Sequence, residues 1–380
     1  MRTSKLLAVL FALAMLVAAC GDAPAEETTD DAGGGDTASS EAPDASESDG
    51  DTAQATDFSA CQVTDTGGVD DRSFNQTAFK GLQDAESEFG ISTSVLESES
   101  DADFEPNINT FVDQGCDLIV TVGFLLGEAT QAAAEANPDV NFAIVDFDFF
   151  DTEATEDVTI DNVRELTFAT DQAAFLAGYL AAGMTETGTV GTYGGLNIPT
   201  VTIFMDGFLA GVRHHNAEKG TDVEVIGWDG SDGLFTGNFE SQDDGRQLTE
   251  QLIQRDADII MPVAGPVGLG SAAALEDAGE GSLIWVDTDG YESASQFSDL
   301  MLTSVVKNMD VAVFDTIATA IDGSFEGGLY VGTLENDGVA IAPFHDFEDE
   351  VPDELKSELD TLREGIIAGD VSVSSADYEG

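Results

Sequence analysis

The chain has 380 residues, which is enough for two domains, and its 75 Asp and Glu residues against 12 Lys and Arg residues give a formal net charge of -63. This balance excludes a nucleic-acid partner, because phosphate contacts need clustered cations. We interpret the acidic excess as a feature that keeps the protein soluble in salty surroundings, where ions screen its self-repulsion. The alternative is a buffer for divalent cations, but the closest segment, Asp229 to Asp232, lacks the spacing of a calcium loop.

The amino terminus has the pattern of a targeting segment. Arg2 and Lys5 precede an apolar run, residues 6–19, which is too short for an ordinary membrane span and matches a signal-peptide core. The run closes on Val-Ala-Ala-Cys20, the pattern of a bacterial lipoprotein signal. We therefore expect residues 1–20 to be a lipoprotein signal peptide and a lipid on Cys20 to anchor the protein at the extracytoplasmic face of the cell membrane. The alternative is a plain secretory peptide with an incidental cysteine.

A low-complexity segment follows. Residues 21–57 contain acidic side chains, Ala, Gly, Ser, Thr and Pro but no Lys or Arg. Such a composition cannot bury enough apolar surface to offset the entropy of ordering. We expect a disordered acidic linker between the anchor and the folded part.

From residue 58 onward, strand and helix patterns alternate. The first set of predicted strands is 62–65, 92–96, 118–122, 142–146 and 158–163, with helices at 73–89, 104–114 and 127–136. After a helix at 172–182 the alternation resumes, with strands at 189–193, 223–227, 259–263 and 283–287 and helices at 201–216, 242–255 and 268–278. Repeated β then α predicts parallel sheets covered on both faces.

The remaining elements are too few for a third domain. They are a strand at 302–305, a helix at 310–321, a closing pair of strands at 329–334 and 339–341, and an amphipathic helix at 353–368, which we expect to pack on the second lobe. We predict an α/β protein with two doubly wound parallel-sheet lobes joined by a hinge. The first lobe would take residues 58–165 plus about 290–325, and the second 166–289 plus about 326–380.

The segment Asp65-Thr-Gly-Gly-Val-Asp-Asp-Arg-Ser-Phe-Asn-Gln-Thr-Ala-Phe-Lys-Gly81 lies where a strand passes into a helix. Gly67 and Gly68 give the turn conformational freedom, and Ser73 is placed to cap the helix. Open α/β sheets bind their ligands at this carboxyl edge. The loop thus offers candidate ligand-binding residues: Asp65, Thr66, Phe74 and Asn75.

This segment, DTGGVDDRSFNQTAFKGL, resembles the opening motif of the basic membrane protein family of bacterial lipoproteins. Further segments resemble that family in order, namely 112–124, 137–146, 175–191, 207–212 and 302–315, so the resemblance spans roughly residues 58–345. It implies a type I periplasmic-binding fold and a PnrA-like, purine-nucleoside-binding subunit of an ABC importer, partnered by permease and ATPase subunits.

A nucleoside binder needs rings for the base. Phe74 is one candidate, and Phe239, in Gly237-Asn-Phe, matches the Gly-Ser-Phe segment of the family. Stacking a base on an aromatic side chain contributes about 1 to 3 kcal/mol. The alternative for either side chain is core packing, and residues 227–236 look longer than the family pattern, which can shift Phe239.

The binder also needs polar partners. Asp65 and Asp146 each end a predicted strand and can accept hydrogen bonds from a purine, whereas helix capping or a salt link between the lobes is the alternative, above all for Asp71. The resemblance implies that Asp287 holds the ribose hydroxyls and that Lys307 donates to the sugar.

A glycine loop adds a possible backbone contact. The resemblance implies that the amide of Gly265 faces the ligand, although Pro266 replaces a glycine of the family and removes one N–H. The loop does not have the spacing of a dinucleotide or phosphate loop.

The sequence contains few residues in patterns typical of catalytic or metal-binding sites. His214 and His215 are adjacent on a helix and point apart, His345 stands alone, and neither a hydrolase motif nor a Cys and His cluster is present in the sequence. We expect a binding protein with no catalytic residues, no metal and no cofactor.

Cys61 and Cys116 remain once Cys20 is assigned to the lipid. In a sheet of order 2-1-3 the first and third strands are neighbours, so the two cysteines could form a disulfide, and a pair of buried free thiols is the alternative.

The rival function is a sensory or surface lipoprotein of the same fold, which would bind a sugar or another small ligand without a transporter.

Overall fold

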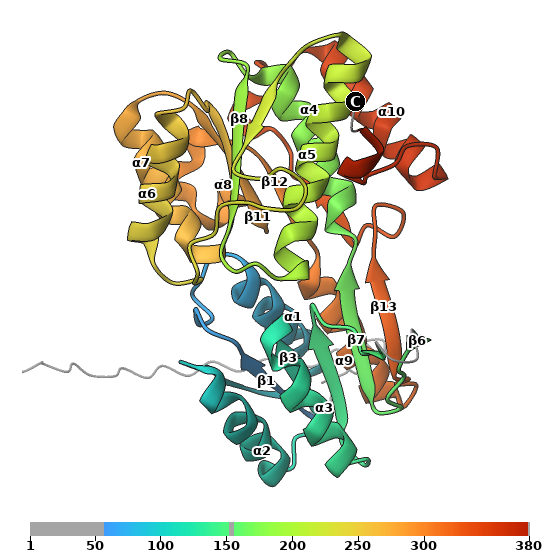
Figure 1. Cartoon of the computed structure of the whole chain (residues 1–380). Helices are drawn as coiled ribbons and strands as arrows, with labels where there is room; N and C mark the ends of the chain where they lie inside the picture. Colours follow the sequence, from blue (N-terminus) through green and yellow to red (C-terminus); the bar gives the residue numbers. More distant parts are fainter. Residues whose placement is uncertain (1–56, 152–155, 379–380) are drawn as a thin grey trace, which may run out of the picture. The chain divides into compact units, whose positions relative to one another are not determined.

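The computed structural model describes residues 57–151 and 156–378. The predicted signal peptide, Cys20 and all but the last residue of the predicted linker lie outside the described residues. Within them, no helix is both long and apolar enough to cross a membrane. The described chain contains two six-stranded sheets with helices packed on them (Figure 1). We call each sheet with its helices a lobe.

The first sheet is entirely parallel and has the order β13-β7-β4-β3-β1-β2. Its strands are β1 Ser59–Thr64, β2 Ser92–Leu96, β3 Leu118–Val122, β4 Asn141–Val145, β7 Val163–Phe168 and β13 Gly328–Gly332. A small separate hairpin pairs β5 Phe150–Asp151 with β6 Glu156–Asp157. β13 lies beside β7 although about 160 positions separate them in the sequence (Figure 1).

The second sheet has the order β14-β12-β11-β10-β8-β9 and is parallel except for β14, which runs antiparallel to β12. Its strands are β8 Thr189–Gly194, β9 Glu224–Ile226, β10 Ile259–Val263, β11 Ser282–Asp287, β12 Met301–Lys307 and β14 Val339–Ile341. The two sheets share the same strand order apart from this last strand. The structure thereby confirms the predicted α/β class with two mostly parallel sheets.

Helices pack on both faces of the first sheet. They are α1 Phe74–Phe89, α2 Phe104–Gln114, α3 Gly127–Ala136 and α9 Met309–Asp322. Successive side chains of a strand point to opposite faces. Accordingly, Ala60 of β1 packs in the cluster that contains α1 side chains, whereas Val63 packs in the cluster that contains α2 side chains.

The second lobe contains α4 Thr170–Met184, α5 Pro199–Lys219, α6 Gln242–Ile253, α7 Gly268–Ala278, the short α8 Gly290–Ser293 and α10 Asp353–Ala368. Short 3-10 segments cover Asp101–Asp103, Phe124–Leu126, Gly265–Val267, Ser295–Leu300, His345–Phe347 and Ser375–Tyr378. The helix predicted at 353–368 matches α10, which packs on α4 as expected.

Close packing of α4 on α5 depends on glycine. A Cβ atom added to Gly178 would lie 2.0 Å from the backbone oxygen of Phe208, and one added to Gly211 would lie 2.0 Å from the backbone oxygen of Phe175. The backbones of the two helices therefore approach each other where no side chain fits between them.

The structure corrects three sequence-based predictions of strands. The strands at 328–332 and 339–341 do not pair with each other, because β13 joins the first sheet and β14 the second. Strand β12 lies in the second sheet, although residues about 290–325 were predicted in the first lobe. The strand predicted at 158–163 is instead β7 at 163–168. The chain thus passes between the sheets three times: from β7 to α4, from β12 to α9 and from β13 to β14.

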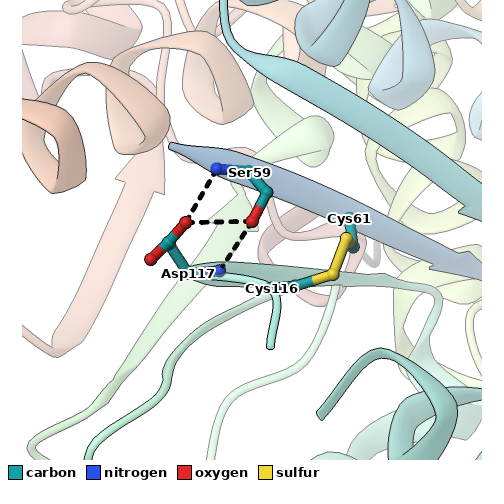
Figure 2. Close-up of a disulfide and its surroundings, with 4 residues drawn as sticks. All are labelled: Ser59, Cys61, Cys116 and Asp117. Atoms are coloured by element: carbon teal, nitrogen blue, oxygen red, sulfur yellow. Dashed lines mark hydrogen bonds between the residues drawn. A yellow bond between two sulfur atoms is a disulfide. The ribbon is translucent and has the colours of Figure 1, made fainter. Parts of the chain in front are cut away.

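A disulfide joins the starts of two neighbouring strands. Cys61 of β1 is bonded to Cys116, which lies just before β3, with a Cα–Cα distance of 6.2 Å (Figure 2). Beside it, the backbone N–H and the hydroxyl of Ser59 donate to Asp117 Oδ2 at 2.8 and 2.9 Å. Of the two alternatives left open by the sequence, the structure has the disulfide.

Candidate ligand-binding cleft

A cleft is lined by residues of both lobes, and all nine residues predicted to bind ligand lie along it. These are Asp65, Thr66, Phe74, Asn75, Asp146, Phe239, Gly265, Asp287 and Lys307. The space between atoms in the cleft is about 560 Å³, part of it open to solvent. Six segments far apart in the sequence therefore meet at one place.

Equivalent positions of the two sheets supply a matched pair of carboxylates. Asp146 directly follows β4 and Asp287 ends β11, and each of these strands is fourth in its sheet when counted from β2 or β9. Both residues are buried and have left-handed backbone conformations, with φ of 66° and 71°. Such conformations cost energy for a residue other than glycine and persist where the surroundings hold them, often at functional sites.

Lys307, the last residue of β12, meets both carboxylates. Its Nζ donates to Asp146 Oδ2 at 2.6 Å and lies 3.8 Å from Asp287 Oδ1, and its side chain is only 2% exposed. The pair with Asp146 crosses from the second sheet to the first. The salt link between lobes that the sequence left as an alternative for Asp146 is therefore present in the structure.

Asp65, which directly follows β1, is held by an amide. Asn75 Nδ2 donates to Asp65 Oδ1 at 3.0 Å and to the backbone oxygen of Thr66 at 3.4 Å. The other amide atom, Asn75 Oδ1, is buried and has no hydrogen-bond partner in the described part of the chain. Because buried polar atoms are normally paired, this oxygen is a candidate acceptor for a ligand N–H or O–H.

Glycine after β3 makes room for this carboxylate. Gly123 has a φ of 122°, and a Cβ atom added there would lie 2.2 Å from Asp65 Oδ2. Any side chain at position 123 would displace the carboxylate. The sequence reading missed this residue, although a glycine at the end of a buried strand is the signal that could have found it.

Burial makes the carboxyl groups of the cleft weak acids. It raises the pKa of Asp65 to about 8, with the Asn75 hydrogen bond acting in the opposite direction. It raises the pKa of Asp71 to about 6 against three backbone N–H donors. Burial also raises the pKa values of Asp146 and Asp287, and the charge of Lys307 opposes both shifts. The net charge of the cleft therefore depends on how many of these carboxyl groups are protonated.

Helix α1 is capped by Asp71, whereas the sequence predicted that Ser73 would cap it. Asp71 caps α1, since Oδ1 accepts from the N–H groups of Ser73 and Gln76 and Oδ2 from that of Asn75. Ser73, predicted to cap the helix, makes no side-chain cap. Its hydroxyl donates instead to Asp287 Oδ2 at 2.8 Å. The structural role foreseen for Asp71 is present, and Ser73 is a contact between the lobes.

The two predicted rings come from different lobes. Phe74 begins α1, and Phe239 lies in the loop before α6; both line the cleft and are partly buried against the core. Phe239 packs on the backbone of Gly195, where an added Cβ atom would lie 2.2 Å from its ring. Although residues 227–236 look longer than the family pattern, Phe239 still lines the cleft.

Further residues line the cleft that the sequence reading did not single out as ligand-binding. They are Asp71, Gly123, Phe124, Ile198, Thr200, Val201, Phe204, Val263, Ala264, Pro266 and Val286. Phe204 and its neighbours belong to the start of α5, which follows β8 as α1 follows β1. These positions could have been found from the sequence, because ligands bind at the start of the helix that follows a central strand.

The site offers binding groups of three kinds, namely aromatic faces, carboxyl or amide groups and one ammonium. Among residues 57–151 and 156–378, no group of three or more His, Cys, Asp and Glu side chains could hold a metal ion. Aromatic faces, carboxyl or amide groups and an ammonium can together recognise a flat polar molecule.

Comparisons with known proteins agree with the fold. A family model described as ABC transporter substrate-binding protein PnrA-like matches residues 58–377. A CD4+ T-cell-stimulating antigen of Listeria innocua is 31% identical over 346 residues, covering 85% of this chain and 90% of its own length. An ABC transporter nucleoside-binding protein, BmpA, of Lactococcus lactis subsp. cremoris is 32% identical over 338 residues, covering 84% of this chain and 90% of its own length.

A similar structure has also been solved. ABC transporter system solute-binding proteins from Aeropyrum pernix match with a TM-score of 0.74 and 26% identity, covering 83% of this chain and 92% of theirs.

Proposed function

Since the chain belongs to the PnrA-like family of ABC transporter substrate-binding proteins, we propose that it captures a purine nucleoside between its two lobes and delivers it to an ABC importer. Proteins of this family are extracytoplasmic solute-binding proteins rather than enzymes, and they work with permease and ATPase subunits. The family resemblance seen in the motifs is thereby confirmed. The ligand, the lipid anchor and the residue roles are our proposals.

One observation supports the ligand class above the others: aromatic and acidic side chains from both lobes line a single cleft. We assign Phe74 and Phe239 to the base, because each ring could stack on one face of a purine. Stacking of this kind contributes about 1 to 3 kcal/mol per ring. The relative from Lactococcus lactis is named a nucleoside-binding protein, which agrees with this assignment.

The polar groups divide between base and sugar. Asp65 and the unpaired Asn75 Oδ1 lie at the first-lobe side of the cleft and would accept from the N–H groups of the base, and this donation would favour the ionised form of Asp65 and lower its raised pKa. Asp287 and Lys307 would bind the ribose hydroxyls, with Asp146 holding the ammonium in place. An analogue without these hydroxyls would leave buried polar groups unpaired and would bind more weakly.

We propose that the three connections between the sheets form the hinge. Contacts between the lobes, such as Ser73 with Asp287 and Lys307 with Asp146, would hold the lobes together, and a bound ligand would add to them and favour the closed form. The liganded form would then differ in shape from the free form, which is how a permease could recognise it. We further propose that a lipid on Cys20 and the segment 21–57 tether the protein to the cell membrane.

The test is isothermal titration of the chain, purified in detergent and concentrated salt, with adenosine, guanosine, inosine, uridine and ribose. We expect at least one purine nucleoside to bind more tightly than uridine and ribose. Tight binding of ribose with no response to any purine would overturn the proposal and favour a sugar-binding protein.

A variant pair tests the ring assignment. Phe74→Leu should weaken purine nucleoside binding by about 5- to 100-fold, because it removes one stacking face. Phe79→Leu is the matched control, since Phe79 lies on the same helix and does not line the cleft. Equal affinities for the two variants would remove Phe74 from the site.

A further inference from the structure

The ammonium of Lys307 lies among aromatic rings as well as carboxylates. Its Nζ lies over the rings of Phe74, Phe168 and Phe204, at 5.1, 5.6 and 5.1 Å from the ring centroids. These distances are within the roughly 6 Å at which a cation is attracted to the face of a ring. Lys307 is also among the largest fully buried side chains of the described chain.

The rings come from both lobes. Phe168 ends β7 in the first sheet, and Phe74 begins α1. Phe204 lies on α5 in the second lobe, which also carries Lys307 on β12. The ammonium is therefore enclosed only where first-lobe and second-lobe residues meet.

Two of these rings have no part in the proposed base sandwich. Phe204 is almost completely buried and lines the cleft, and Phe168 is also buried and lines the adjoining hollow. An ammonium taken out of water needs compensation; Asp146 accepts from one of its N–H groups, and Asp287 Oδ1 lies 3.8 Å away. Ring faces compensate further without competing for those N–H groups, so they leave hydrogen-bond donors free for a ligand.

We propose that Phe168 and Phe204 are positioning residues of the binding site: their faces hold the Lys307 ammonium between Asp146 and the sugar of the ligand. The reference to the sugar rests on the proposed function. The enclosure of the ammonium by the rings does not depend on the sugar. An experiment can therefore contradict the proposed function without contradicting the ring enclosure, and the reverse.

The test changes the electrostatics of a ring without changing its packing. Phe204 is replaced in the full chain by phenylalanine with one, two and three ring fluorines, which progressively weaken the negative potential of the ring face. We expect nucleoside affinity to fall stepwise, to a total of about 2- to 30-fold. The same series at Phe208, buried one turn further along α5, is the matched control and should change affinity little.

Two further measurements identify Lys307 as the group through which the rings act. The stepwise loss at position 204 should disappear in a Lys307→Met background, and a free purine base, which lacks the sugar, should bind equally well across the series. A merely structural ring would affect both ligands alike. Phe168 should give the same pattern as Phe204.

Thermal unfolding without ligand separates this inference from the proposed function. We expect the melting temperature to fall stepwise with fluorination at position 204, and this trend to vanish in Lys307→Met. That result in a chain that binds no nucleoside would sustain the ring enclosure and reject the proposed ligand. Affinity and melting temperature that do not change with fluorination, or that change equally at Phe208, would overturn the inference.

Discussion

Asp65 should make the stability of the folded chain depend on pH. The folded protein holds a proton on Asp65 up to pH about 8, whereas the unfolded chain loses it near the ordinary pKa of 3.8. Between these values the folded state binds more protons, so stability is highest at low pH and falls as pH rises toward 8. Asp65→Asn keeps the oxygen that accepts from Asn75 and removes the titration.

The magnitude follows from the width of this interval. At pH 7 the folded chain retains the proton about 3 pH units above the unfolded pKa of 3.8, which at about 1.4 kcal/mol per unit amounts to about 4 kcal/mol. Asp65→Asn should therefore be more stable than the parent chain at neutral pH. The advantage should grow by about 1.4 kcal/mol per unit between pH 5 and 8 and then level off.

The assay is equilibrium unfolding in guanidinium chloride, followed by the fluorescence of the two Trp residues at pH 5, 6, 7, 8 and 9. The difference between the two proteins is the quantity to read, because Asp71, Asp146 and Asp287 contribute to both curves with the same sign. A difference that stays constant from pH 5 to 8, or that shrinks as pH rises, would refute the reasoning.

Three further substitutions test other parts of the structure by urea unfolding. Ser73→Ala should cost about 1 to 3 kcal/mol, because Asp287 loses a buried hydrogen-bond donor, and an unchanged midpoint would show that this contact is not needed. Replacing Cys61 and Cys116 by Ser opens a loop of 55 residues and should cost about 4 kcal/mol; reduction of the parent chain should have the same effect, and a loss under 1 kcal/mol would contradict it. Gly123→Ala should cost roughly 2 to 5 kcal/mol and weaken ligand binding, since its methyl group would lie 2.2 Å from a carboxylate oxygen, and a stable, binding-competent variant would disprove the close approach.

Much of the architecture was readable because its signals are local. The alternation of strands and amphipathic helices predicted both sheets, and the helix at 353–368 was placed with its observed bounds. Asp65, Thr66, Phe74, Asn75 and Asp146 were found from short motifs at strand ends, where parallel sheets bind their ligands, whereas the family resemblance pointed to Phe239, Gly265, Asp287 and Lys307. Each of these signals depends on neighbours within a few residues, so one sequence sufficed to find them.

The tertiary structure decided what depends on residues far apart in the chain. Which sheet β12, β13 and β14 join is set by pairing partners that no local period encodes. Asp71 and Ser73 are both good helix caps, and only the position of Asp287 in the other lobe releases the serine from that role.

Lys307 illustrates the same limit most clearly. The sequence predicted a strand just before it, at 302–305, and the family resemblance implied a contact with the sugar. Its ion pair with Asp146, 161 positions away, and its enclosure by three rings exist only because the two lobes meet there. A buried charge is stabilised by whatever the fold brings to it, and that is a property of the assembled chain rather than of any segment.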